Sequence, residues 1–192
     1  MTKLIFATLA ASLVALPTVA SAQALTAPVI AVVDVQRATA QCNACKTALT
    51  QLEGQFNAVK SLQTSLETPL RTEAAALQAA AAALSGKAPD AALQARATAF
   101  ERKQADAQRQ LAARDQTFQR NRAYVLQQIS AKLNPALTSV MTKRGANVMI
   151  DSANVVRAAP GVDVTNDVIA ALNASLTTIG TTAPAQAAPA SR

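Results

Sequence analysis

The chain has 192 residues and no histidine, and its 18 Lys and Arg residues against 11 Asp and Glu give a net charge of +7. Catalytic triads of the Ser-His-Asp type, Cys-His pairs and the common zinc sites each lose a required member without histidine, so we expect no enzyme and no cofactor. Aromatic residues, which would stack on bases, make up only 3% of the chain, so no nucleic acid partner is expected, whereas the positive charge allows weak contact with an anionic membrane surface.

The first segment, residues 1–22, is predicted to be a secretory signal peptide. A basic start at Lys3 precedes an apolar run over 4–16, and Ala20-Ser21-Ala22 is a small-residue cleavage site. The apolar run is shorter than the roughly 20 residues that a membrane span requires. We therefore expect an exported chain from which this segment is removed, with a retained N-terminal anchor as the alternative.

A buried strand is predicted over residues 28–35, where Pro-Val-Ile-Ala-Val-Val-Asp-Val forms an almost continuous β-branched run. Such a run is typical of a strand that is covered on both faces. Residues 23–40, which contain this strand and lead into a helix, are assigned to the first part of a small β-rich oligomerisation body.

Residues 41–143 are predicted to form a long antiparallel helical hairpin, with a turn at 85–89. Counting in sevens from Cys42 and from Cys45 gives two series of mostly apolar residues, which is the pattern of a coiled-coil seam. The first series contains Leu49 and Phe56, and the second contains Leu52 and Val59. Gly86 and Pro89 are suited to ending one helix and starting the next.

Prolines and polar seam residues are predicted to weaken this hairpin. Pro69 and Pro135 each lack a backbone N–H, so we expect a kink at Pro135 and either a kink at Pro69 or a restart of the helix with Thr68 as cap. Polar residues at seam positions cost stability, and they are Gln63, Glu73, Gln104, Arg114 and Asn121. The sequence therefore predicts an arm that bends and that binds its partners weakly.

Basic residues gather on the second arm of the hairpin. Between residues 94 and 122 there are seven cations against three acidic residues. A solvated helix face accounts for such a run, and a basic binding face is the alternative. The candidate basic face consists of Arg96, Arg102, Lys103, Arg109, Arg114, Arg120 and Arg122.

After the hairpin, residues 144–180 are assigned to the second part of the β-rich body, with a short C-terminal helix. Two strands are predicted over 147–151 and 155–158, paired as a hairpin. Thr165 is predicted to cap the helix that follows. Residues 181–192 are rich in Pro and Ala, and we expect a disordered tail there.

The predicted body is too small to be stable by itself, because three short strands and one helix bury little apolar surface. The strands also leave unpaired edges. We therefore expect an α+β fold in which several copies share one β core and each helical hairpin projects from it. The predicted oligomerisation core is Val29, Ile30, Val32, Val33, Val148 and Ile150.

Cys42 and Cys45 leave several interpretations open. They fill apolar seam positions as thiols, or they form a disulfide, within one chain or between chains, in an oxidising compartment. A thioredoxin-like redox site would require a βαβ fold, of which the sequence offers only one strand. A metal site would have two soft ligands and no histidine unless several chains pooled their cysteines.

Three stretches together resemble the Skp/OmpH family of periplasmic chaperones: Ile-Ala-Val-Val-Asp at 30–34, Val-Met-Ile-Asp-Ser-Ala-Asn-Val-Val at 148–156 and Asp-Val-Thr-Asn-Asp-Val-Ile at 163–169. The resemblance implies a homotrimer in the periplasm, with a β body shared between subunits and hairpin tentacles around a cavity. It also implies an ATP-independent holdase that keeps unfolded outer-membrane proteins from aggregating in transit to the outer membrane.

The chain departs from the family pattern at two places. Cys42-Asn-Ala-Cys45 is not part of it, and the Ala-rich distal arm is less charged than a typical tentacle. A second interpretation of the same hairpin is a structural coiled-coil protein of the cell envelope, which acts as a spacer with one fixed partner.

Overall fold

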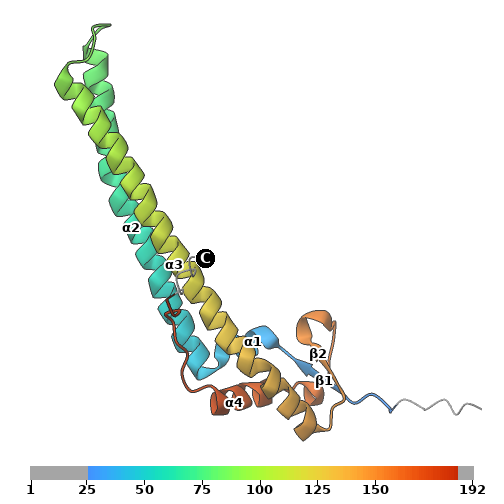
Figure 1. Cartoon of the computed structure of the whole chain (residues 1–192). Coiled ribbons are helices and arrows are strands. Elements are labelled where there is room, and N and C mark those ends of the chain that lie inside the picture. The colour runs from blue at the N-terminus through green and yellow to red at the C-terminus, as the bar shows by residue number, and fades with distance from the viewer. Residues whose placement is uncertain (1–25, 186–192) are drawn as a thin grey trace, which may run out of the picture.

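In the computed structural model, which describes residues 26–185, a long two-helix arm projects from a small base (Figure 1). The fold is mostly helical with one small sheet, so the predicted α+β class holds, and the predicted signal peptide lies outside the described residues. The arm consists of α2 (Asn43–Ala83) and α3 (Ala91–Arg144). The base contains β1 (Ile30–Val33), α1 (Val35–Gln41), β2 (Val148–Asp151), the 3₁₀ turns η1 (Ser152–Asn154) and η2 (Pro160–Val162), and α4 (Thr165–Ser175).

The two arm helices are joined at the predicted turn. Ser85 and Gly86 adopt positive φ angles of 49° and 88°, which reverses the chain after α2. The Asp90 side chain then accepts a hydrogen bond from the Leu93 backbone N–H at 2.8 Å and caps α3. At its other end α3 stops at Gly145, a left-handed residue with φ 65°.

Both prolines lie inside uninterrupted helices, so the predicted restart at Thr68 is wrong. α2 runs through Pro69 and α3 runs through Pro135. Each proline is exposed, as is the residue four positions before it. The carbonyl that each proline leaves without a helical partner is therefore able to bond water, and the helix continues.

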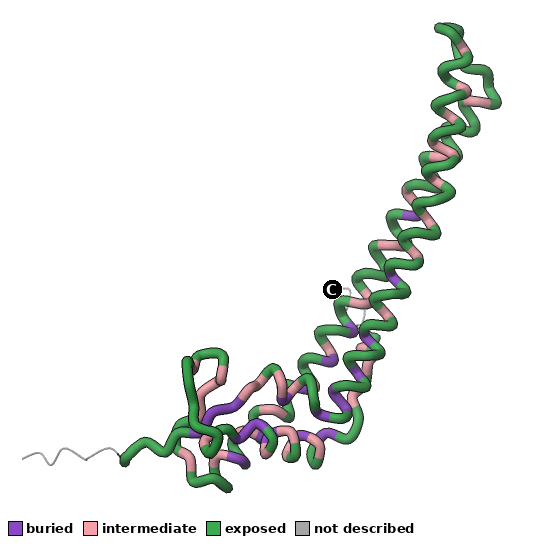
Figure 2. The backbone as a smooth tube through the Cα atoms, turned by 180° about the vertical axis from the view of Figure 1, so that it is seen from behind, coloured by how far each residue is buried: buried purple, intermediate pink, exposed green. Residues whose placement is uncertain are grey.

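The two predicted seam series are buried to different extents. Leu52 and Val59 of the second series are buried, whereas Leu49 and Phe56 of the first series are 39% and 42% exposed. Within residues 26–185, no further helix covers the exposed sides of Leu49 and Phe56. Burial is concentrated at the base and the lower arm, and the distal arm is mostly exposed (Figure 2).

The sheet pairs strands that are separated by the whole arm. β1 and β2 are parallel, with Ile30 beside Val148 and Val33 beside Asp151. The predicted second strand of a hairpin, over 155–158, is wrong, because residues 155–158 are irregular. Asp151 accepts a hydrogen bond from the Ala153 backbone N–H at 3.0 Å, and this contact turns the chain into η1 directly after β2.

The α4 helix closes the base against α3 and α1, with Val168 and Leu172 fully buried. Thr165 does not cap this helix as predicted; it is the first helical residue. Its buried hydroxyl accepts the Asp34 backbone N–H at 2.9 Å and donates to the Asp163 carboxylate. Thr165 thus joins the end of β1 to the start of α4.

After α4 the chain turns back along the arm (Figure 1). Residues 181–185, the described part of the predicted disordered tail, include Thr181 and Ala183, which hydrogen-bond to both arm helices. This part of the chain is held against the arm, which differs from the prediction.

Candidate functional site

An open apolar groove lies on one side of the lower arm and has a volume of about 550 Å³. Its lining residues, here called the arm groove, are Leu49, Leu52, Glu53, Phe56, Phe118, Gln119, Arg122 and Leu126. The rings of Phe56 and Phe118 meet across the two helices with centroids 5.6 Å apart. Leu126 is 49% exposed, so large apolar side chains are presented to solvent along this groove.

Two cations and one carboxylate flank the apolar floor of the arm groove. Lys60 places its Nζ 4.5 Å from the centre of the Phe56 ring, and Arg122 and Glu53 line the groove itself. Exposed apolar patches of this kind mark binding surfaces. The groove is suited to apolar side chains with an acidic neighbour, and none of its lining residues is a typical nucleophile.

A second apolar surface, here called the base patch, lies at the sheet. Val29, Ile30 and Val148 are 50%, 45% and 38% exposed. Of the other residues predicted for an oligomerisation core, Val32 and Val33 are buried within the chain and Ile150 is half-buried. The exposed members lie at the end of β1 and β2 that Ile30 and Val148 share.

The seven predicted basic residues do not form one face. They all lie on α3, and at about 3.6 residues per turn they point to different sides of it. Lys103 pairs with Glu73 of the opposite arm at 2.6 Å, and Arg109 pairs with Asp106. Arg122 alone among the seven lines the arm groove.

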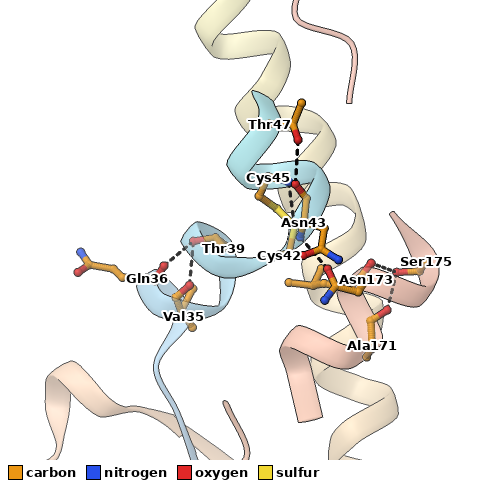
Figure 3. Close-up of a disulfide and its surroundings, with 11 residues drawn as sticks. Val35, Gln36, Thr39, Cys42, Asn43, Cys45, Thr47, Ala171, Asn173 and Ser175 are labelled. Atoms are coloured by element: carbon orange, nitrogen blue, oxygen red, sulfur yellow. Dashed lines mark hydrogen bonds between the residues drawn. A yellow bond between two sulfur atoms is a disulfide. The ribbon is translucent and has the colours of Figure 1, made fainter. Parts of the chain in front are cut away.

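The structure joins Cys42 to Cys45 by a disulfide within the chain (Figure 3). Both cysteines are fully buried. Cys42 separates α1 from α2 and its sulfur accepts the Cys45 backbone N–H at 3.1 Å, while Asn43 N–H donates to Asn173 Oδ1 at 2.7 Å. The bridge therefore lies where the arm leaves the base, and its sulfurs are shielded from solvent partners.

Residues 26–185 offer neither a metal cluster nor a membrane-spanning helix. The described side chains include no cluster of three or more His, Cys, Asp or Glu residues that could hold a metal ion. Over the same range, each helix is either too short or too polar to cross a membrane.

Sequence reasoning missed the arm groove. Leu49 and Phe56 were assigned to the seam because they recur every seven residues, and a seam residue and an exposed apolar residue have the same sequence signal. Leu126, which lies one position after the buried Val125, could have indicated a second apolar stripe on α3. The pairing of the two stripes depends on how the helices are rotated against each other.

The comparisons with known proteins point in one direction. The sequence profile of the family described as "Outer membrane protein (OmpH-like)" matches residues 29–172. Among solved structures, a crystal structure from Caulobacter crescentus CB15, described as an outer membrane chaperone (OmpH-like), is similar with a TM-score of 0.64 and 24% identity, covering 82% of this chain and 90% of that one. A search of curated protein sequences finds no match.

Proposed function

The chain belongs to the OmpH-like family of outer membrane proteins, and on that premise we propose that it is an ATP-independent periplasmic chaperone. Its clients are unfolded outer-membrane proteins, which it holds and keeps from aggregating until they reach the outer membrane. The family itself is the one predicted from the sequence, so that prediction is confirmed. The observation that carries the proposal is the arm groove, where Leu49, Phe56 and Leu126 remain exposed.

The arm groove suits a holdase because its contacts are apolar, shallow and adaptable. Burial of apolar area stabilises a complex without requiring one fixed geometry, and an unfolded client offers many alternative apolar segments. Because each contact is weak, the client dissociates readily. Clients that fold elsewhere no longer rebind, so the bound clients are released without nucleotide hydrolysis.

The proposal includes a homotrimer that shares its β body. The base patch of Val29, Ile30 and Val148 is apolar and exposed in a single chain. Within the described residues, β2 has one neighbouring strand, β1, so its other edge is free to pair. Three chains that meet there would project three arms around a common cavity, with the arm grooves available to a client.

The charge of the chain supports the same assignment. With a net charge of +7 and Arg122 in the groove, the arm attracts acidic segments and makes weak contact with anionic membrane surfaces. The remaining exposed arginines of α3 attract acidic segments from a longer distance. Salt at physiological concentration screens this electrostatic attraction.

A light-scattering assay tests the proposal. A urea-unfolded outer-membrane barrel is diluted into buffer with and without the chain, in the absence of nucleotide. The expected result is suppression of scattering at a roughly equimolar ratio of trimer to client. Unchanged scattering at several-fold excess would reject the holdase and favour the coiled-coil spacer with one fixed partner.

A further inference from the structure

On the lower arm, four side-chain amides hold an irregular piece of the chain's own backbone, which bends at Thr182. The amides, here called the amide clamp, belong to Gln51 and Gln55 of α2 and to Asn121 and Gln128 of α3. The piece they hold, here called the strap, is residues 180–183, which follow α4 and lie against the arm (Figure 1).

The clamp recognises mainly main-chain atoms. Gln128 bonds both polar groups of Gly180: its Oε1 accepts the N–H at 3.0 Å and its Nε2 donates to the C=O at 2.8 Å. Gln55 Nε2 donates to the Thr181 C=O at 3.0 Å, and Asn121 Oδ1 accepts the Ala183 N–H at 2.9 Å. A carboxamide offers one donor and one acceptor, as a residue of a neighbouring strand does.

The contacts alternate between the arms along the strap. Gly180 and Ala183 bond α3, and Thr181 between them bonds α2. Asn121 Nδ2 also donates to Gln55 Oε1 at 2.8 Å, so two clamp side chains bond each other as well as the strap, and Asn121 is 6% exposed with the strap in place. Side chains of both arm helices thus bond the main chain of the strap on either side of the bend at Thr182.

Two features set which chains fit. A Cβ at position 180 would lie 3.2 Å from Cε1 of Tyr124, so any residue larger than glycine must push the Tyr124 ring aside by a few tenths of an ångström, and the clamp favours glycine there. Thr181 supplies the one side-chain bond of the strap to the clamp, from its Oγ1 to Gln51 Oε1 at 2.6 Å. The ligand class is therefore a short polypeptide segment without regular secondary structure, with glycine favoured at the Gln128 position and preferably followed by a hydroxyl residue.

We propose that the amide clamp is a binding site for short irregular segments of unfolded polypeptide, and that the strap occupies it in cis until such a segment displaces it. This inference rests on the proposed holdase function. It adds to the apolar arm groove a second site, which binds the main chain of a client. Within the strap, Gly180 and Thr182 are exposed and Thr181 and Ala183 are half-buried. The apolar anchors precede the strap: Leu176 is buried, and Ile179 packs against the core. We expect residues 180–183 to leave the clamp while both anchors stay in place.

The test uses the full chain and a fluorescent peptide that copies residues 176–185. Gly180→Val drives a side chain into Tyr124 and releases the strap, while Thr182→Val, at an exposed position with no clamp contact, is the matched control. In the control chain the strap occupies the clamp for most of the time, so few molecules can bind the peptide. The Gly180→Val chain should therefore bind the peptide about tenfold more tightly than the control. Equal affinities overturn the proposal.

Further variants show whether the clamp itself is responsible. In the Gly180→Val chain, adding Gln55→Ala and Gln128→Ala should abolish the gain, and adding Gln127→Ala, an exposed neighbour, should keep it. A peptide with valine in place of its glycine should not bind. Binding that survives loss of both glutamines, or that accepts the valine peptide, overturns the proposal.

Hydrogen exchange of the wild-type chain tests displacement of the strap without relying on variants, which could misfold. Excess peptide should accelerate hydrogen exchange of the Gly180 and Ala183 amides, which the clamp otherwise protects, and unchanged exchange counts against displacement. The light-scattering assay separates the two proposals. If the chain binds the peptide but leaves client scattering unchanged, the clamp proposal stands and the holdase proposal is rejected. If the chain suppresses scattering but binds no peptide, the holdase proposal stands and the clamp proposal is rejected.

Discussion

Phe56 of α2 and Phe118 of α3 lie with their ring centroids 5.6 Å apart, yet Phe56 keeps 42% of its surface in solvent. One side of the ring contributes to the contact between the arms, and the other side forms the arm groove. This division lets a single residue be substituted to affect client binding with little effect on the fold.

Phe56→Ser should therefore weaken suppression of client aggregation severalfold and lower the free energy of unfolding by about 1 to 2 kcal/mol, because it also removes the ring pair with Phe118. The matched contrast is Ile129→Ala on α3, at a residue that is 5% exposed and does not line the arm groove, which should cost about 2 to 5 kcal/mol. Urea titration and client light scattering measure the two effects. Full activity of the Phe56→Ser chain would remove the arm groove from the proposed function.

Val148→Lys should disrupt the proposed trimer, because it places a charge in the base patch where apolar surface would be shared. Val156→Lys is the matched control, since Val156 is fully exposed on the loop after η1. Molar mass by light scattering should show about three chains for the control and a shift toward a single chain for Val148→Lys. A wild-type chain that runs as a monomer would contradict the shared β body.

The Cys42–Cys45 bridge should resist alkylation until it is reduced, because both cysteines are buried and bonded to each other. Electrophoresis should show a single-chain band with and without reductant, and mass spectrometry should find two added alkyl groups only after reduction. Cys42→Ser with Cys45→Ser should lower the free energy of unfolding by about 2 kcal/mol, since the closed loop is short. A disulfide-linked dimer or trimer band would contradict the intrachain bridge.

Acidification should weaken the base at Asp163. The Thr165 hydroxyl and N–H, with a smaller contribution from Arg37, lower the pKa of this carboxyl below its ordinary value of 3.8. The stabilisation is therefore fully present above pH 3.8 and is lost as the pH falls through the lowered pKa. Because the Asp163 side chain is 47% exposed, solvent screening keeps the effect to roughly 1 kcal/mol or less.

The comparison that measures this effect is the urea midpoint of the wild-type chain against Asp163→Asn at pH 7 and at pH 3. The wild-type chain should be the more stable at pH 7, and the difference should shrink at pH 3. A difference that is constant between the two pH values would show that the carboxylate charge contributes nothing.

Much of the fold could be predicted because its signals are local. The turn at 85–89 follows from Gly86 and Pro89, and the first strand follows from its β-branched run, since both depend on backbone preferences of the residues themselves. The strand over 155–158 was predicted wrongly for the complementary reason. The composition of residues 155–158 suits a strand. However, β2 pairs with β1, which precedes the arm in the sequence, and not with residues 155–158.

The candidate sites were less predictable because they depend on which sides of two helices meet. Leu49 and Leu52 have the same hydrophobic signal, and only the rotation of α2 against α3 exposes one and buries the other. The amide clamp has no signal at all along the chain. Gln55 and Gln128 look like ordinary polar surface residues until the hairpin brings them together beside residues 180–183.

By itself, the sequence determined the helical hairpin, its turn, the first strand and the family, because each follows from residue preferences, periodicity or short motifs that are read without knowing what packs where. The tertiary structure alone decided the parallel pairing of β1 with β2, the intrachain Cys42–Cys45 bridge, the exposed stripe of the arm groove and the return of the strap. The strand pairing, the exposed stripe and the strap depend on contacts between residues far apart in sequence or on the rotation of one helix against another, and neither is encoded at a fixed spacing. The bridge joins residues only three positions apart, and the structure decided which of the alternatives left open by the sequence is formed.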